Sequence, residues 1–182
     1  MASSRKPRRV RNRPAPSPVV LSTEQLDGIM SIANADPRLH ITRDVVQLLL
    51  ETGMRSGELC NLRVLDVDVA NNRLHISGVK TGGRYIPLTP RALNALQSLR
   101  AQYSSSSFVL GDKACLVLRR VSLTFRKIAG EIGIGDCSLH SLRRFFARRL
   151  ASGGISPMTL AHLMGNSSLR LTERYYWKGD HS

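Results

Sequence analysis

The segment LTERYYWKG, residues 171–179, places two adjacent tyrosines, Tyr175 and Tyr176, close to the end of the sequence. A tyrosine hydroxyl is protonated at neutral pH and is then a poor nucleophile. It can attack a phosphate ester when arginines hold the phosphate and a neighbouring group accepts the phenolic proton. Each of these tyrosines could be such a nucleophile or a packing residue.

Two arginine-containing segments could hold such a phosphate. In TGMRSGEL, Arg55 follows an expected helix end, and Glu58 lies three residues further on, within reach on the next helical turn. This pair could be an ordinary surface ion pair, or an arginine that its own carboxylate holds so that the guanidinium points at an anion. In LHSLRRFFARRL, His140 and Arg143 share one face at the start of an expected helix, where N-terminal N–H groups favour an anion. Two guanidinium groups suit a phosphodiester, since each can make paired hydrogen bonds to phosphate oxygens.

A lysine could complete the chemistry. The segment GVKTGGRYIPL places Lys80 on the lip of an expected hairpin, where a lysine is usually solvated. If the hairpin lies over a cleft, this lysine could protonate a leaving group. No cluster of Asp and Glu points to a metal site, so stabilisation of negative charge would fall to Arg and Lys. We therefore expect no metal and no other cofactor.

The elements that position these residues are predicted to form a mainly α fold with one small antiparallel β-sheet, an α+β arrangement. The first helix begins at a capping box formed by Ser22 and Gln25, and LHITRDVVQLLLETG is a second, more buried helix capped by Gly53. SGELCNL is a short helix, NNRLHISGV and RYIPL are strands joined by a KTGG turn, and TPRALNALQSLRAQ is again helical. Further helices are expected over 119–132, 139–152, 156–165 and 168–177.

The charge of the chain points to a polyanionic partner. Its 182 residues hold 27 Lys and Arg against 13 Asp and Glu, a formal net charge of +14. Residues 1–20 are rich in Pro, Ser and Arg and read as a basic disordered arm or linker, which leaves residues 21–182 as one folded domain.

The same composition bears on the cellular compartment. No apolar run approaches the length that a bilayer needs, and no secretory signal opens the sequence. Cys60, Cys115 and Cys137 fit neither a disulfide framework nor a zinc site. We expect three reduced, mostly buried thiols in a cytoplasmic protein that has no membrane partner.

The chain resembles the catalytic domain of the tyrosine site-specific recombinases, the phage integrase family. The resemblance lies in the order of four features along the sequence: the arginine, the lysine, the His-x-x-Arg pair and the tyrosine. ETGMRSGELCNLRVLDVD is similar to the first arginine box of that family, and VKTGGRYIPL to its lysine hairpin. LHSLRRFFARRL is similar to its His-x-x-Arg box, and LMGNSSLRLTERYY to its closing Leu-Gly-His-Ser-Ser…Thr-x-x-Tyr box. The resemblance covers about residues 20–178 in the family's order and spacing.

The resemblance implies a role for each matching residue. Arg55 and Arg143 would clamp the scissile phosphate, with Glu58 as a supporting carboxylate behind Arg55. Lys80 would be the general acid for the departing 5′ oxygen. His140 would assist proton transfer at the phenol.

The closing box selects between the two tyrosines and contains one departure. The family's nucleophile lies nine residues after the histidine of Leu-Gly-His; Asn166 takes that position here, so the count reaches Tyr175 and leaves Tyr176 as a packing neighbour. An asparagine amide can still donate a hydrogen bond to a phosphate oxygen and bind substrate, but it cannot carry a proton as histidine can. His162, one helical turn earlier, is expected on an exposed helix face.

The resemblance implies a DNA breaking and rejoining enzyme. Tyr175 would form a 3′-phosphotyrosyl link on double-stranded DNA and free a 5′ hydroxyl, without ATP or metal. Four protomers, monomeric or weakly associated when free, would assemble on two DNA sites for integration, excision or inversion, at the nucleoid.

Two other functions remain open at this point. The same residues would serve DNA relaxation of the type IB topoisomerase kind. The chain could also be a non-catalytic DNA-binding protein derived from a recombinase, a reading that Asn166, the short C-terminus and the lack of the family's N-terminal helical domain favour. That lack is expected either of a catalytic fragment or of a short member such as the fimbrial-switch invertases.

Overall fold

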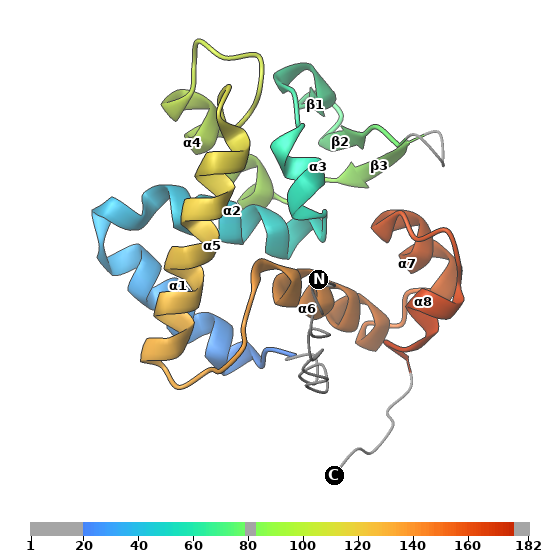
Figure 1. Ribbon diagram of the computed structural model, residues 1–182. Helices are drawn as coiled ribbons and strands as arrows, with labels where there is room; N and C mark the ends of the chain where they lie inside the picture. Colours follow the sequence, from blue (N-terminus) through green and yellow to red (C-terminus); the bar gives the residue numbers. More distant parts are fainter. Residues whose placement is uncertain (1–19, 79–82, 177–182) are drawn as a thin grey trace, which may run out of the picture.

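Eight α-helices and three short strands form the part of the chain that the computed structural model describes, residues 20–78 and 83–176 (Figure 1). The helices are α1 (Thr23–Ala35), α2 (His40–Thr52), α3 (Ser56–Cys60), α4 (Pro90–Gln102), α5 (Ala114–Glu131), α6 (Leu139–Ser152), α7 (Pro157–Met164) and α8 (Arg170–Glu173). The strands are β1 (Val67–Asp68), β2 (Arg73–Ile76) and β3 (Arg84–Pro87). The predicted mainly α fold with a small antiparallel sheet is confirmed, while the predicted arm and Lys80 lie outside the described residues.

Local signals place the first two helices where the sequence predicts them. The Ser22 hydroxyl accepts a hydrogen bond from the Gln25 N–H, and the Gln25 side chain accepts one from the Ser22 N–H, so the capping box at the start of α1 is complete. Helix α2 ends at Gly53, whose φ of 61° lies in the left-handed region that favours glycine. A Cβ at Gly53 would also collide with the Phe146 ring of α6. Gly53 therefore lets α2 end against α6, two residues before Arg55.

The sheet has the order β1-β2-β3, and all of its pairs are antiparallel. Leu74 pairs with Ile86, and both side chains are buried. The two longer strands match the prediction, and β3 is an edge strand, as Pro87 requires. Strand β3 alternates buried and exposed residues, so that Arg84 faces inward on the same side as Ile86.

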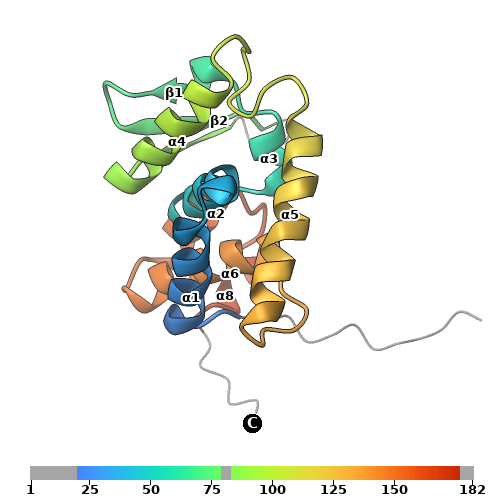
Figure 2. The same ribbon diagram turned by 90° about the vertical axis from the view of Figure 1, so that its left-hand side faces the viewer.

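Helix α2 runs through the middle of the fold and contacts α1, α4, α5 and α6 (Figure 2). Val45, Val46 and Leu48 on α2 are completely buried, because the apolar residues of this helix face neighbours on nearly every side. Phe125 of α5 fills the same core. This core fixes the end of α2, and with it the segment that carries Arg55.

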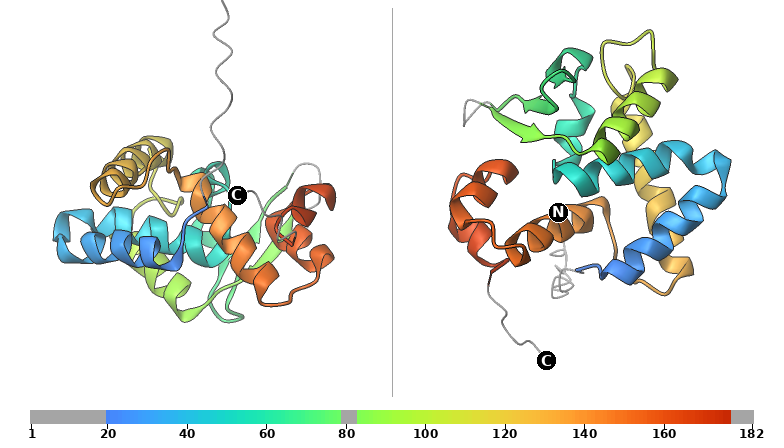
Figure 3. Two further views of the ribbon diagram at one scale, coloured as in Figure 1. Left: turned by 90° about the horizontal axis from the view of Figure 1, so that it is seen from below. Right: turned by 180° about the vertical axis from the view of Figure 1, so that it is seen from behind.

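The C-terminal helices form a smaller core of their own. The two views in Figure 3 show α7 and α8 beside α6, and α7 also contacts β3. Phe146 of α6 packs with Leu160 and Met164 of α7, and Tyr175 and Tyr176 pack against this cluster. The closing segment is thus held next to the His-x-x-Arg helix.

Two predicted helix boundaries are wrong. Helix α5 begins at Ala114 instead of 119, because Ala114 and Leu118 continue the buried stripe of that helix, although the run ACLVL hides the helical period in the sequence. Helix α8 covers only Arg170–Glu173 and not 168–177. The amides of Tyr175 and Tyr176 donate to carbonyls three residues back, so both tyrosines lie in a turn.

The prediction of mostly buried cysteines is also wrong. All three thiols are free, but only Cys137 is buried, whereas Cys60 is half-buried and Cys115 exposed. The Cys60 and Cys115 sulfurs lie 2.8 Å apart because α3 and α5 pack side by side, a proximity that sequence spacing does not show. Burial, and then the neighbouring Cys115 thiol, raise the pKa of Cys60 to about 12. Among the described residues no helix is long and apolar enough to cross a membrane.

Candidate active site

Arg55 and Glu58 form a closed pair at the start of α3. The Arg55 N–H donates to Glu58 Oε2 at 2.7 Å, and Arg55 Nη1 donates to Glu58 Oε1 at 3.0 Å. Glu58 therefore caps the helix and holds the guanidinium of its first residue at the same time. The Arg55 side chain remains 46% exposed, so the held guanidinium is open to solvent.

Arg143 is the fifth residue of α6 and is only 4% exposed. Its guanidinium donates to the Gly53 carbonyl at 2.7 Å and to the Met164 carbonyl. Burial, and then the neighbouring Arg55 charge, lower the pKa of Arg143 to about 10, so it stays charged at neutral pH. Gly53 and Met164 end α2 and α7, so Arg143 fixes both helix ends around the site.

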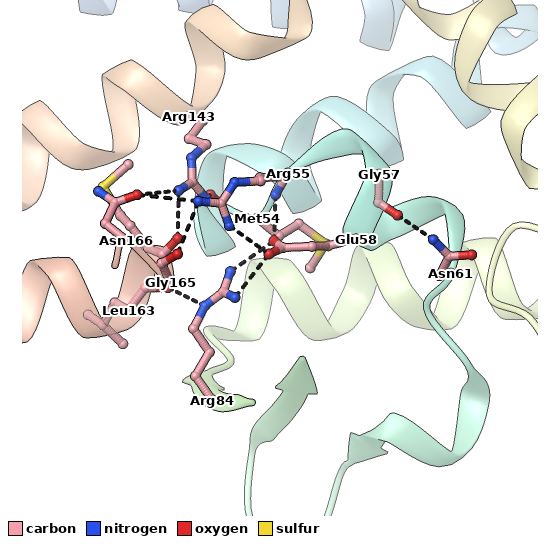
Figure 4. A network of polar contacts seen from close by, with 12 residues as sticks. Met54, Arg55, Gly57, Glu58, Asn61, Arg84, Arg143, Leu163, Gly165 and Asn166 are labelled. Atoms are coloured by element: carbon pink, nitrogen blue, oxygen red, sulfur yellow. Dashed lines mark hydrogen bonds and ion pairs between the residues drawn. The ribbon is translucent and has the colours of Figure 1, made fainter. Parts of the chain in front are cut away.

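Asn166 joins the two arginines (Figure 4). Its Oδ1 accepts hydrogen bonds from Arg55 Nη2 at 3.3 Å and from Arg143 Nη2 at 3.2 Å. Its Nδ2 donates to the buried Thr172 hydroxyl at 3.1 Å. We expected this amide to offer its N–H to a phosphate oxygen, but in the structure the N–H group faces α8 and the oxygen faces the arginines.

Arg84 belongs to the same network, although the sequence analysis did not select it. Arg84 Nη1 and Nη2 donate to the two oxygens of Glu58 at 3.0 and 2.8 Å, and Nε donates to the Leu163 carbonyl at 2.7 Å (Figure 4). The signal that could have found it is the alternation of RYIP, which puts Arg84 on the inward face with Ile86. A buried arginine needs a carboxylate partner, and Glu58 is that partner.

His140 lies near several of the same positively charged side chains. It lies on the first turn of α6, and its partial desolvation lowers the pKa of its ring below the ordinary histidine value. The cationic side chains around it lower the pKa further: Arg144, Arg143, Arg174 and Arg55. A histidine that is neutral at pH near 7 can accept a proton.

The two tyrosines differ in what their hydroxyls do. The Tyr176 hydroxyl donates to the Ile155 carbonyl at 2.6 Å, in the turn between α6 and α7. The Tyr175 hydroxyl has one hydrogen bond within the described part of the chain, which it accepts from the exposed Arg174 Nη2 at 3.2 Å. The Arg174 guanidinium lies 5.1 Å from the centre of the Tyr175 ring. Tyr175 also lies near enough to Arg143 to affect the pKa of that arginine. The Tyr176 hydroxyl is therefore engaged with the fold, whereas the choice of Tyr175 as the nucleophile stays a prediction.

Comparison with known proteins identifies the family of the chain. The model of the phage integrase family matches residues 19–181. The chain belongs to the phage integrase family.

Relatives within this family share its sequence at a moderate level. The tyrosine recombinase XerC of Myxococcus xanthus is 29% identical over 176 residues, which cover 89% of this chain and 59% of the relative. XerC of Corynebacterium efficiens is 31% identical over 166 residues, covering 87% of this chain and 54% of the relative. The chain therefore spans somewhat more than half the length of these relatives.

Solved structures of similar fold include an integrase and a recombinase. The Tn1549 transposon integrase, solved in complex with circular intermediate DNA, superposes with a TM-score of 0.79 at 21% identity over 93% of this chain and 64% of the other. The XerA recombinase superposes with a TM-score of 0.72 at 23% identity over 97% of this chain and 65% of the other. At this identity the likeness establishes the shared fold.

The site of this integrase-family chain carries an excess of positive charge. The network in Figure 4 contains the guanidinium groups of Arg55, Arg84 and Arg143 and a single carboxylate, that of Glu58. Arg143 bonds to carbonyl oxygens and to an amide oxygen, so its charge has no directly bonded carboxylate among the described residues. Cations held together without equal countercharge favour an anionic ligand.

His162 and Lys80 are the other two candidates that the sequence offers. His162 is exposed on α7, as expected for a residue outside the site. Lys80 lies outside the described residues, and its assignment as the general acid stays a prediction.

Proposed function

We propose that this chain is the catalytic part of a site-specific DNA recombinase that breaks and rejoins double-stranded DNA through Tyr175. The observation that carries the proposal is the convergence of Arg55 and Arg143, from two separate helices, on one side-chain oxygen. A phosphodiester oxygen is a stronger acceptor than an amide oxygen and brings the missing negative charge. Membership of the phage integrase family and the relatives named tyrosine recombinase support the proposal.

The residues divide the reaction between them. Arg55 and Arg143 hold the non-bridging oxygens of the scissile phosphate and stabilise the charge that grows on them in the pentavalent transition state. The Tyr175 oxygen attacks the phosphorus and forms a phosphotyrosyl bond, while the bond to the 5′ oxygen breaks and its electron pair leaves with that oxygen. His140 accepts the phenolic proton, and Lys80 gives a proton to the departing 5′ hydroxyl.

Rejoining reverses these steps. A 5′ hydroxyl attacks the phosphotyrosyl link, Tyr175 leaves and regains its proton, and the phosphodiester is restored. Because the covalent link keeps the bond energy, the reaction needs neither ATP nor a metal ion. When the attacking hydroxyl belongs to a partner strand, the result is integration, excision or inversion. The same proposal includes assembly of four protomers on two DNA sites, weak association of the free protein and a location at the nucleoid in the cytoplasm.

A plasmid assay tests this function against its alternatives. A supercoiled plasmid carries two copies of the DNA that flanks the gene, and the products are resolved on agarose gels. Deletion or inversion between the copies is the expected result. Relaxed topoisomers alone would support the topoisomerase-like reaction instead. A mobility shift on native gels without any change in the plasmid would support the non-catalytic binder.

A further inference from the structure

Arg84 is an arginine buried at an inward position of a β-strand. Its side chain is 6% exposed, and all of its polar bonds go to groups of the candidate site. Its Nε and both terminal nitrogens already donate to protein oxygens, so the guanidinium fork is closed on Glu58 and is not presented to a DNA phosphate. Any part that it takes in the reaction must therefore pass through the residues it touches.

The Arg84 guanidinium connects three segments that the chain brings together from a distance. Its two terminal nitrogens donate to the two oxygens of Glu58 on α3. This bidentate pair of bonds fixes the orientation of the carboxylate as well as its position. Its Nε donates to the Leu163 carbonyl on α7 at 2.7 Å. Strand β3 thereby ties the arginine box at α3 to the closing box that follows α7.

Gly165 shows how closely Arg84 fits the closing box. A Cβ on Gly165 would lie 2.9 Å from Arg84 Cζ, and the φ of Gly165 is 59°, so both packing and backbone conformation require glycine here. The Gly165 carbonyl accepts from Arg55 Nη2 at 3.0 Å. The same glycine thus presents one side to Arg84 and a hydrogen bond to Arg55.

The orientation of the Arg55 guanidinium depends on Glu58. The Arg55 side chain is 46% exposed and is flexible by nature, and among the described residues its carboxylate contact is Glu58. Glu58 in turn has only Arg55 and Arg84 as side-chain donors within that part of the chain. If Arg84 is lost, Arg55 alone still donates to the Glu58 carboxylate, so the carboxylate is less constrained and holds the Arg55 guanidinium less firmly.

We propose that Arg84 is a positioning residue, which fixes the Glu58 carboxylate so that Arg55 is aimed at the scissile phosphate. Since this role presupposes the proposed DNA cleavage, its test needs one readout that depends on cleavage and one that does not.

The first readout is the rate of covalent protein–DNA adduct formation on nicked duplexes from the DNA flanking the gene. Arg84→Met, which keeps much of the side-chain length and removes the charge, is expected to slow adduct formation about a hundredfold, the size of effect that a misplaced reactive geometry produces. DNA affinity should change less than about twofold, because the guanidinium fork of Arg84 is closed on Glu58 and makes no contact with DNA in the proposed complex. Arg84→Lys, which keeps the charge but not the fork, should fall between the two. Arg100→Met is the matched control, because Arg100 is a half-buried arginine whose bonds go to the Tyr103 and Ser106 carbonyls.

A double variant separates positioning from general stability. Arg84→Met combined with Glu58→Gln should be no slower than Glu58→Gln alone, because Arg84 acts through Glu58. Independent, multiplying losses would contradict the inference, as would an Arg84→Met protein that forms adduct at the wild-type rate. If Arg84→Met does not fold, Arg84→Lys decides: a wild-type rate overturns the inference, and a loss of about tenfold with unchanged DNA affinity supports it.

The second readout is the titration of the Glu58 carboxyl by ¹³C NMR, assigned by comparison with Glu58→Gln. Burial raises the pKa of Glu58, but hydrogen bonds from Arg84 and then Arg55 outweigh burial and hold the pKa below its ordinary value. Among the described residues, the other ionisable groups near this carboxyl are Arg143, and Asp66 and His75, which line a small hollow beside it. Arg84→Met should raise the pKa of Glu58, and Arg100→Met should not.

The two readouts distinguish the two failures. An unchanged Glu58 titration in Arg84→Met overturns the positioning role, whatever the enzyme does. If Arg84→Met raises the pKa of Glu58 but the wild-type protein forms no adduct, the result would support the hydrogen bonds from Arg84 to Glu58 and count against the proposed recombinase instead.

Discussion

Arg55 and Arg143 donate hydrogen bonds to the same atom, Oδ1 of Asn166, at 3.3 and 3.2 Å. One of the two guanidinium groups is buried and the other is open to solvent. Two like charges are held in this way on either side of one acceptor, where a phosphate oxygen would be bound more strongly. Asn166 therefore aligns the arginines in the absence of DNA.

Removing this shared acceptor should impair the alignment. Asn166→Ala is expected to slow covalent adduct formation up to about tenfold and to lower the free energy of unfolding by about 1 kcal/mol, the net worth of a hydrogen bond. Both arginines keep their bonds to backbone carbonyls, so the effect is moderate. Asn71→Ala, which removes an exposed amide bonded to Asp68, is the control and should leave adduct formation unchanged. An Asn166→Ala protein as fast and as stable as the wild type would show that the shared oxygen aligns nothing.

Arg55 and Arg143 should differ in how much each contributes to the free energy of unfolding. Arg143→Ala leaves the Gly53 and Met164 carbonyls without their donor in a buried place, and we expect a loss of at least about 2 kcal/mol in the free energy of unfolding. Arg55→Ala removes an exposed ion pair and should cost less than about 1 kcal/mol. Urea denaturation of both variants measures the difference. Equal losses would contradict the assignment of Arg143 as the structural member of the pair.

Tyr175 and Tyr176 should also differ in how much their hydroxyls contribute to the free energy of unfolding. Tyr176→Phe removes a hydroxyl that donates to the Ile155 carbonyl, and it should lower the free energy of unfolding by about 1 kcal/mol. Tyr175→Phe removes a hydroxyl bonded only to the exposed Arg174, and thermal unfolding should stay close to that of the wild type. A larger loss for Tyr175→Phe would show that its hydroxyl serves the fold.

His140 should make stability depend on pH in a defined direction. The folded state lowers the pKa of His140, so between that value and the ordinary value of about 6.5 the unfolded chain binds more protons than the folded one. Stability is therefore fully present above pH 6.5 and is lost as the pH falls through the folded pKa. The free energy of unfolding, measured from pH 7.5 to 5.5, should decline more steeply for the wild type than for His140→Gln. Parallel profiles would mean that His140 does not titrate as the site geometry requires.

The sequence predicted those parts of the fold and site that local residues determine. The capping box of Ser22 and Gln25, the left-handed Gly53 and the helix over 139–152 follow from short-range preferences, and the structure confirms them. The contact between Arg55 and Glu58 is likewise a short-range helix cap.

What the sequence did not predict depends on contacts between distant segments. The approach of Cys60 to Cys115 arises only when α3 packs on α5. Arg84 reads as an ordinary strand residue until the inward face of β3 meets Glu58. The turn at Tyr175 follows α8, a four-residue helix whose C-cap is Arg174 in a right-handed helical conformation instead of a left-handed glycine, so no local signal marked its end.

The most direct test of the central claim is the identity of the nucleophile. Wild-type protein, Tyr175→Phe and Tyr176→Phe are incubated with nicked duplexes from the DNA flanking the gene, and covalent adducts are separated on a denaturing gel. The account predicts an adduct with the wild type and with Tyr176→Phe, and none with Tyr175→Phe. An adduct that survives Tyr175→Phe and disappears in Tyr176→Phe would contradict it, and so would a wild-type protein that binds the duplex on a native gel without ever forming an adduct.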